Sequence, residues 1–294
     1  MNARAICVCL DEGVGRVVEA ALTAADIEVE RHASLPAEPG VVALFVVDRG
    51  TREAAADRLC DAAAPVVVVG DDLDDDGLIT LMLEAPVSHL VRDPADRELG
   101  ITSEKLVSGD VFGLEKYLAR DVRIGERVVA SDAEKRAAIA EVTAWAQAVG
   151  ARTPVVHRLA SVIDELLMNA LHDAPRESRP LLLTTDNRRA VVRWGSDDRT
   201  LAISVSDGFG ALRQRDVIDH VRHARDDRGR PNPATTEEPG AGLGLYLVLA
   251  NVASLIVNVD PGRLTEVVCL FDLARRDRRA IGGGVRSLHV FQAP

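Results

Sequence analysis

Two polar side chains at helical spacing, Glu165 and Asn169, lie in the segment VIDELLMNALHDA, residues 162–174. Apolar residues recur in this segment every three or four positions, which predicts one amphipathic helix. Residues four apart are neighbours on one helix face, and Asp173 continues the line, with His172 beside it. On a mostly buried helix, a carboxylate next to an amide costs free energy unless the pair binds something. The alternative is a polar helix face that meets water.

Two glycine motifs follow this helix. The predicted strand 201–206 runs into the sequence DGFG at 207–210, and GAGLGL at 240–245 opens an apolar helix predicted over 245–255. Glycines at a helix N-terminus let backbone N–H groups approach an anion, and the helix dipole assists. A single glycine string is weak evidence. This one lacks the strand-first context of a dinucleotide-binding fold and the Lys-Ser/Thr of a P-loop.

The ordered set of motifs is more specific than any one of them. ExxxN on a helix, DGFG after a strand and GAGLGL before a helix together resemble the GHKL ATP-binding superfamily. This superfamily includes gyrase B, MutL, histidine kinases and anti-sigma-factor serine kinases. The resemblance covers roughly residues 132–273. It implies ATP and Mg²⁺ as cofactors, and a two-layer α/β sandwich with a mixed sheet.

The resemblance also implies a role for each matching residue. Glu165 matches the catalytic carboxylate that orients and deprotonates the attacking water or hydroxyl, and Asn169 matches the Mg²⁺ ligand. Asp207 matches the residue that accepts a hydrogen bond from the adenine amino group, and Thr265, in LTEVVCLF, matches a threonine near adenine. The remaining matches are nucleotide-binding backbone positions: Gly208, Gly210, Gly240, Gly242, Leu243 and Gly244.

One departure concerns the position three residues past the asparagine. Many kinases of the superfamily carry Lys or Arg there, and this chain carries His172. A neutral imidazole gives phosphates less help than a fixed cation. Residues 211–239, rich in Arg, Asp and Pro, occupy the place of the lid.

The elements expected to position these residues follow from periodicity and caps. Ser131 is a predicted N-cap with Glu134 three residues on, the spacing of a capping box. Two consecutive helices are expected over 132–149 and 155–173. Strand-like segments separated by turns predict a meander, at 180–184, 190–194 and 201–206.

The first part of the chain alternates strand and helix patterns. Short apolar runs predict strands at 5–10, 27–31, 41–47, 65–69 and 88–91. Helical patterns lie between them, at 14–24, 52–62 and 76–83. Continuous Val-rich strands separated by helices indicate a doubly wound parallel sheet, flavodoxin-like, whose working site lies at the carboxyl ends of the strands.

This order resembles the receiver domain of bacterial response regulators. An acidic pair after the first strand, Asp11 and Glu12, and a possible phospho-acceptor after the third, Asp48, match the pattern of that family. The family also carries Ser or Thr after the fourth strand and Lys after the fifth, where this chain has Gly70 and Arg92. We therefore expect a degenerate receiver-like domain used for docking or dimerisation, with phosphorylation of Asp48 as the alternative.

Composition limits the classes of function. At 294 residues the chain is long enough for two domains, and its net charge of -11 argues against binding to nucleic acid or to anionic membranes. The four cysteines lie within or beside apolar runs and lack zinc-site spacing, which favours reduced thiols. No apolar run approaches the ~20 residues of a membrane span. We expect a cytoplasmic protein.

Three regions are expected along the chain: a receiver-like domain over 1–94, a helical connector over 95–131 with one short helix at 111–119, and the ATP-binding domain over 132–294. The tail alternates as a strand over 285–291. The sequence leaves open whether this strand joins a sheet edge or a partner.

These features predict an ATP-binding signalling protein with a protein partner or substrate, and a homodimer is possible. It is either a Mg-ATP-dependent protein kinase of the anti-sigma serine-kinase-like branch or a nucleotide-gated regulator, and weak ATPase activity is a further option. A phospho-accepting histidine helix is not found upstream of Glu165, which argues against autophosphorylation. The alternative class is a non-catalytic scaffold whose two domains serve partner binding.

Overall fold

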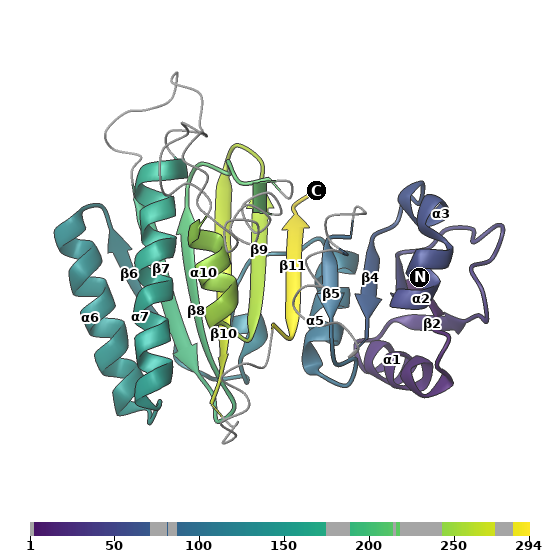
Figure 1. The fold of residues 1–294 in the computed structure, drawn as a ribbon, viewed down its shortest axis with the longest axis horizontal. Coiled ribbons are helices and arrows are strands. Elements are labelled where there is room, and N and C mark those ends of the chain that lie inside the picture. The colour runs from purple at the N-terminus through teal and green to yellow at the C-terminus, as the bar shows by residue number, and fades with distance from the viewer. Residues whose placement is uncertain are drawn as a thin grey trace, which may run out of the picture. The chain divides into compact units, whose positions relative to one another are not determined.

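The computed structural model describes residues 3–70, 81, 87–174, 189–213, 216–217, 243–273 and 285–294. They form a mixed α/β protein that contains both parallel and antiparallel strand pairs (Figure 1). The chain divides into two compact units. The first comprises Met1–Val111 with Arg286–Phe291, and the second comprises Phe112–Val285 with Gln292–Pro294.

The sheet of the first unit has the strand order β2-β1-β3-β4-β5, with all neighbours parallel, and β11 is antiparallel to β5. The strands are β1 (Arg4–Val8), β2 (Glu28–Arg31), β3 (Leu44–Asp48), β4 (Val66–Val69), β5 (His89–Val91) and β11 (Ser287–Gln292). Successive residues of the inner strands are buried, as in the run Val46 and Val47. Both faces of the parallel sheet are therefore covered, which is why these strands read as continuous apolar runs.

Helices α1 (Glu12–Ala24) and α5 (Arg97–Ser108) pack against each other in the first unit. Their residues Val18, Leu22 and Leu99 belong to one apolar cluster with side chains of β1, β3 and β4. The short helices α2 (Arg49–Ala54) and α3 (Ala56–Cys60) follow β3. β3 leads directly into α2, and three residues separate the end of β1 from the start of α1.

Strand β11 shows that the first unit is assembled from two distant parts of the chain. Leu288 is in register with Leu90, and His289 with His89. The Arg92 N–H donates to the Arg286 carbonyl at 2.8 Å, which extends the pairing by one step. The question that the sequence leaves open is thus answered: the C-terminal strand completes a sheet of this chain.

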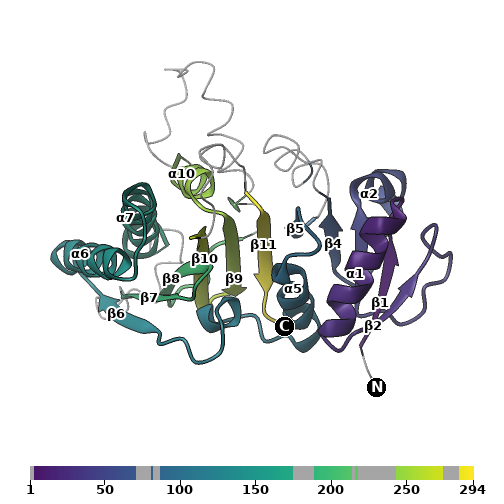
Figure 2. The same cartoon turned by 90° about the horizontal axis from the view of Figure 1, so that it is seen from below.

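The sheet of the second unit is antiparallel in every described pair, in the order β9-β10-β8-β7-β6. The strands are β6 (Gly125–Val129), β7 (Ala190–Ser196), β8 (Thr200–Asp207), β9 (Ser254–Asp260) and β10 (Leu264–Asp272). Helices α6 (Asp132–Ala148), α7 (Thr153–Met168) and α10 (Leu243–Asn251) lie on one side of these strands (Figure 2). α7 packs between the other two helices and against β8.

The N-terminus of α6 carries the predicted cap. The Ser131 Oγ accepts the Glu134 N–H at 3.3 Å, and the Glu134 carboxylate accepts the Ala130 N–H at 2.7 Å. This is the reciprocal arrangement of a capping box, shifted by one residue on the return bond. Pro154 lies in the first turn of α7, where its missing N–H leaves no hydrogen bond unmade.

Several predicted elements differ from the structure. The helix predicted over 245–255 ends at Asn251, and the strand β9 already begins at Ser254. The helix predicted over 52–62 is two short helices, because the chain breaks at Ala55. Only a 3-10 helix, η1 (Leu114–Tyr117), forms within 111–119. The strand predicted at 180–184 and the helix predicted at 76–83 lie outside the described residues, apart from Leu81.

Among the described helices, none combines the length and the apolar character that crossing a bilayer requires.

Candidate functional site

Glu165 and Asn169 lie at the end of one continuous helical segment. α7 ends at Met168, and a π-helical turn, η2 (Asn169–Asp173), continues from it. Val162, Ile163 and their apolar neighbours are fully buried, whereas Glu165 and Asn169 are half-buried. The predicted two-faced helix is present, with a widened turn that begins at the asparagine itself. Single π turns inside helices are frequent at functional sites, and they change the direction of the side chains that follow.

The start of α10 lies directly against the Glu165 carboxylate. A Cβ atom built on Gly244 would lie 1.7 Å from Glu165 Oε1 and 2.4 Å from its carboxyl carbon. Any side chain at this position would overlap the carboxylate unless the flexible Glu165 side chain moved away. The carboxylate thus meets the first turn of a helix, where the dipole favours negative charge.

Asp207 and Thr265 form a second polar pair, on two adjacent strands. They are register partners in the antiparallel β8–β10 pairing. Side chains directly opposite each other share one face, with Cβ atoms roughly 5 Å apart. Asp207 is 8% exposed and Thr265 is 3% exposed. Among the residues that the structure describes, the Thr265 Oγ1 has no hydrogen-bond partner, and a buried hydroxyl of this kind is a place where a bound polar group would be stabilised.

The chain after Asp207 turns tightly against the β9–β10 connection. The Asp207 Oδ1 accepts the Phe209 N–H at 2.9 Å. Gly210 has φ +57°, and its carbonyl accepts the Gly262 N–H at 3.0 Å. A Cβ at Gly210 would lie 2.1 Å from the Asp260 carbonyl oxygen. The second glycine of DGFG is therefore needed both for its backbone conformation and for close packing.

Gly208, the first glycine of that motif, has a different environment. A Cβ built there would meet no atom of the described residues within 4 Å, apart from its two neighbours in the chain. The backbone at Gly208 is thus open on the side where a side chain would project.

The two polar pairs belong to elements that touch. η2 lies against β8, and α10 packs on α7. The structure therefore brings Glu165 together with Gly244, and Asp207 together with Thr265. Both pairs belong to the helices and strands that pack on each other in the second unit. Leu243 is the first residue of α10, and the structure describes its backbone but not its side chain. Gly240 and Gly242 lie outside the described residues, as do most of the lid positions.

The His172 side chain contacts Asp132, so it does not take the position of a phosphate-binding cation. Its Nε2 lies 3.6 Å from Asp132 Oδ1 at the start of α6, and the side chain is exposed. On the neighbouring helix, Lys135 Nζ lies 2.9 Å from Asp164 Oδ1. The His172 contact joins α6 to η2, and the Lys135 contact joins α6 to α7.

In the first unit, Asp48 caps the helix that follows its strand. The Asp48 Oδ1 accepts the Thr51 N–H at 2.8 Å, and Oδ2 accepts the Leu10 N–H. Both carboxylate oxygens therefore serve backbone donors. The connection to Leu10 links the carboxyl ends of the neighbouring strands β1 and β3.

Asp11 and Glu12 also lie at a helix N-terminus. The Asp11 Oδ1 accepts the Gly13 and Val14 N–H groups at 2.6 and 3.0 Å, so this residue is the N-cap of α1. The Glu12 side chain is exposed and pairs with Arg16 at 3.5 Å. Asp11 and Asp48 are therefore helix caps and Glu12 is an exposed ion-pair partner, and phosphorylation of Asp48 stays a prediction.

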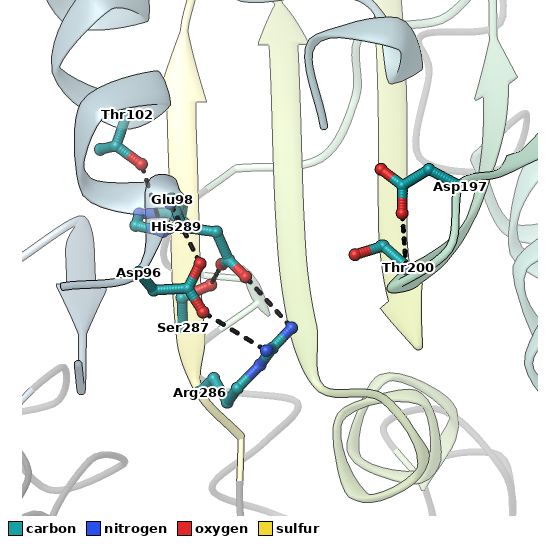
Figure 3. A network of polar contacts seen from close by, with 8 residues as sticks. All are labelled: Asp96, Glu98, Thr102, Asp197, Thr200, Arg286, Ser287 and His289. Carbon is teal, nitrogen blue, oxygen red and sulfur yellow. Dashed lines mark hydrogen bonds and ion pairs between the residues drawn. The ribbon is translucent and has the colours of Figure 1, made fainter. Parts of the chain in front are cut away.

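A buried polar cluster in the first unit was not predicted from the sequence. Glu98 on α5 is 3% exposed and accepts a hydrogen bond from the Ser287 hydroxyl of β11 (Figure 3). Arg286 lies 3.5 Å from Glu98 and 3.3 Å from Asp96. These contacts fasten the C-terminal strand to α5. They join residues nearly 190 positions apart, for example 189 between Glu98 and Ser287, so local patterns carry no signal of them.

Two buried histidines belong to the same region. His289 Nε2 lies 3.4 Å from the Thr102 hydroxyl, and the His89 and His289 rings stack with centroids 5.7 Å apart. Burial, and then the charge of Lys105, lowers the pKa of His89 from 6.5 to about 3. Burial, His89 and Lys105 lower the pKa of His289 as well. Both rings are therefore neutral in the folded protein at physiological pH.

The chain matches no known protein family and no curated protein. Within the described residues, no group of three or more His, Cys, Asp or Glu side chains is arranged to hold a metal ion by itself.

Proposed function

We propose that the second unit is a GHKL-type ATP-binding module and that the chain is a cytoplasmic signalling protein, a Mg-ATP-dependent kinase of the anti-sigma serine-kinase-like branch. The observation that carries this proposal is the Glu165 carboxylate held against Gly244 at the start of α10. The two residues are 79 positions apart and come from the first and last of the three sequence motifs. Their proximity is what a site assembled from those motifs requires.

The Asp207–Thr265 pair supports adenine as the base. Asp207 offers a carboxylate acceptor, and the unpartnered Thr265 hydroxyl offers a donor at the same end of the sheet. The edge of adenine carries a complementary amino donor and ring-nitrogen acceptor. The open backbone at Gly208 leaves space beside this pair.

The half-buried Asn169 would supply its amide oxygen to Mg²⁺, a hard cation that prefers oxygen ligands. Bound ATP supplies an activated phosphoryl group. Glu165 would accept the proton of a substrate hydroxyl at a carboxylate oxygen, and the adjacent α10 N-terminus keeps that carboxylate oriented. His172, directed at Asp132, takes no part in this scheme.

For the first unit we propose a flavodoxin-like, receiver-like domain that docks a regulatory protein partner. The parallel strand order β2-β1-β3-β4-β5 supports this assignment. Both oxygens of Asp48 are bonded to backbone N–H groups, and Gly70 and Arg92 occupy the places of the family's hydroxyl and lysine. These observations favour docking over phosphoryl acceptance.

Calorimetric titration of the full chain with Mg-ATP tests the nucleotide site. We expect a micromolar dissociation constant that Asp207→Asn weakens by about 10- to 100-fold, because a charged acceptor is lost. The matched control is Asp272→Asn, at the opposite end of β10, which should leave affinity unchanged. Absence of nucleotide binding by the folded wild-type chain would refute the proposal.

Turnover separates a kinase from a non-catalytic scaffold. Loss of the Glu165 base in Glu165→Ala should reduce ATP turnover by about 10²- to 10⁴-fold while Mg-ATP still binds. Glu141→Ala, an exposed glutamate on α6, is the control and should keep the wild-type rate. Equal background rates in all three proteins would favour the scaffold.

A further inference from the structure

Two cysteine thiols lie side by side at the end of the first strand. Cys7 is the penultimate residue of β1 and Cys9 follows directly after the strand, and their sulfurs are 3.8 Å apart. Cys7 is 1% exposed, whereas Cys9 is half-buried. Cys60 at the end of α3 is exposed, and Cys269 within β10 is buried. The Cys7–Cys9 pair is thus a local dithiol at the edge of the core, in which Cys9 is the less buried residue.

The two thiols share a proton when the pair ionises. A hydrogen bond from the Cys9 thiol, and then the positive charge of Arg31, lowers the pKa of Cys7. The same hydrogen bond, together with burial, raises the pKa of Cys9. Arg31 is the register partner of Cys7 on β2, which places the guanidinium on the same face of the sheet. Ionisation of the pair therefore places the negative charge mainly on Cys7, and the remaining proton lies on Cys9, from which it can pass to the Cys7 sulfur.

The backbone allows the two sulfurs to close into a ring. Residues two apart on a strand have Cα atoms roughly 6.5 Å apart, near the upper end of the separations that disulfides span. Cys7 is held on both sides by Arg31 of β2 and Val46 of β3. Cys9 lies beyond the last paired residue of β1 and is not constrained in this way. A disulfide across one intervening residue is strained, and strained disulfides are easily reduced.

We propose that Cys7 and Cys9 form a reversible dithiol–disulfide site that a low-molecular-weight disulfide oxidises. The Cys9 sulfur attacks one sulfur of that disulfide as its proton passes to the Cys7 thiolate, a mixed disulfide forms on Cys9, and an external thiolate leaves. The Cys7 sulfur then attacks Cys9, the internal S–S bond forms, and the second thiolate leaves with the Cys7 proton. Two protein thiols are oxidised and one external disulfide is reduced to two thiols, so that electrons and protons balance.

The position of the pair gives its oxidation a structural readout. Leu10, the residue after Cys9, donates its N–H to the Asp48 carboxylate. Closing the ring moves the backbone at Cys9 and so alters the contact that joins the carboxyl ends of β1 and β3. This site lies in the first unit and does not depend on nucleotide binding by the second.

The test uses the full chain in a Cys60→Ser background, incubated in glutathione buffers from reducing to oxidising, then denatured and alkylated. Mass spectrometry should show three alkylated thiols in the reduced protein and one, Cys269, in the oxidised protein. A peptide containing an internal Cys7–Cys9 disulfide should appear, and dithiothreitol should remove it. The Leu10 amide should exchange hydrogen faster after oxidation.

Single-cysteine variants separate the two steps. With Cys7→Ala, oxidised glutathione should leave a stable mixed disulfide on Cys9. With Cys9→Ala, the buried Cys7 should stay unmodified. The proposal is overturned if the wild-type pair stays fully alkylatable in oxidising buffer, or if its mixed disulfide persists without ring closure.

Discussion

The contact between Gly244 and Glu165 yields a quantitative prediction about how the site is assembled. An alanine Cβ at position 244 would lie 1.7 Å from the Glu165 carboxylate oxygen, about half an ordinary contact distance. Relief requires the Glu165 carboxylate to move by nearly 2 Å. Because this side chain is flexible and half-buried, the expected cost is about 1 kcal/mol, the low end of the range for overpacking. Gly244→Ala should therefore destabilise the second unit despite the better helix propensity of alanine.

A double-mutant cycle with Glu165→Ala removes the carboxylate atoms that clash with the new methyl group. In a Glu165→Ala background the methyl group meets no carboxylate, and Gly→Ala near the start of a helix should be neutral or stabilising by up to about 1 kcal/mol. The coupling energy between positions 165 and 244 should thus be about 1–2 kcal/mol. Stability should recover in the double variant, whereas turnover should not, because the base is gone.

Tryptophan fluorescence during urea unfolding is a suitable assay. Both tryptophans of the chain, Trp145 on α6 and Trp194 on β7, belong to the second unit and report on its unfolding. Glu141→Ala combined with Gly244→Ala is the control pair, and its effects should add. If the Glu165 and Gly244 substitutions also add within about 0.5 kcal/mol, the carboxylate does not lie against α10 and the basis of the proposed site is lost.

Three further predictions concern single residues. Because the pKa of His89 is about 3 in the folded protein and 6.5 is its ordinary value, the unfolded chain takes up a proton below pH 6.5 that the folded chain refuses. Stability is complete above pH 6.5 and falls toward pH 3, by about 2 kcal/mol at pH 5 from this group. Hydrogen exchange of the β11 amides should show this dependence of stability on pH. His89→Leu should make the dependence less steep, and the exposed-site control His157→Asn should not change it. An unchanged dependence in His89→Leu would contradict the assignment. Thr265→Val removes an unpartnered buried hydroxyl, so it should raise the free energy of unfolding by about 1 kcal/mol while weakening Mg-ATP binding in calorimetry, and a loss of stability would mean that the hydroxyl is already satisfied. Gly210→Ala, at φ +57° against a backbone carbonyl, should lose at least about 2 kcal/mol in urea unfolding, whereas Gly208→Ala should change little, and equal effects would count against the tight turn.

The strands and helices that follow local rules were predictable from the sequence. Val-rich runs such as those containing Val46 and Val67 are buried on both faces of a parallel sheet. Their sequences are therefore continuously apolar and do not alternate between apolar and polar residues. The stripe on α7 follows the helical period because one face meets the sheet and its neighbouring helices. A continuous apolar run is less informative: residues 245–257 hold the end of α10 and the start of β9, which periodicity alone does not separate.

Helix α5 shows why some elements were missed. Its buried positions include Glu98, Thr102, Ser103 and Lys105, so the apolar stripe that marks a helix is interrupted by polar residues. Those residues are tolerated inside because partners such as Ser287 and Phe291 arrive from the far end of the chain. A pattern that depends on a distant partner cannot be recognised locally.

The candidate site divides in the same way. The sequence suggested the candidates Glu165, Asn169, Asp207 and the glycines through the resemblance of their ordered motifs to an ATP-binding superfamily, because residue type and spacing along the chain are visible without a structure. Only the tertiary structure decided that Gly244 lies against Glu165, that Thr265 is paired in register with Asp207, and that β11 belongs beside β5. Spacing along a helix or strand is set by local backbone geometry, whereas contacts between distant segments are set by the packing of the whole chain.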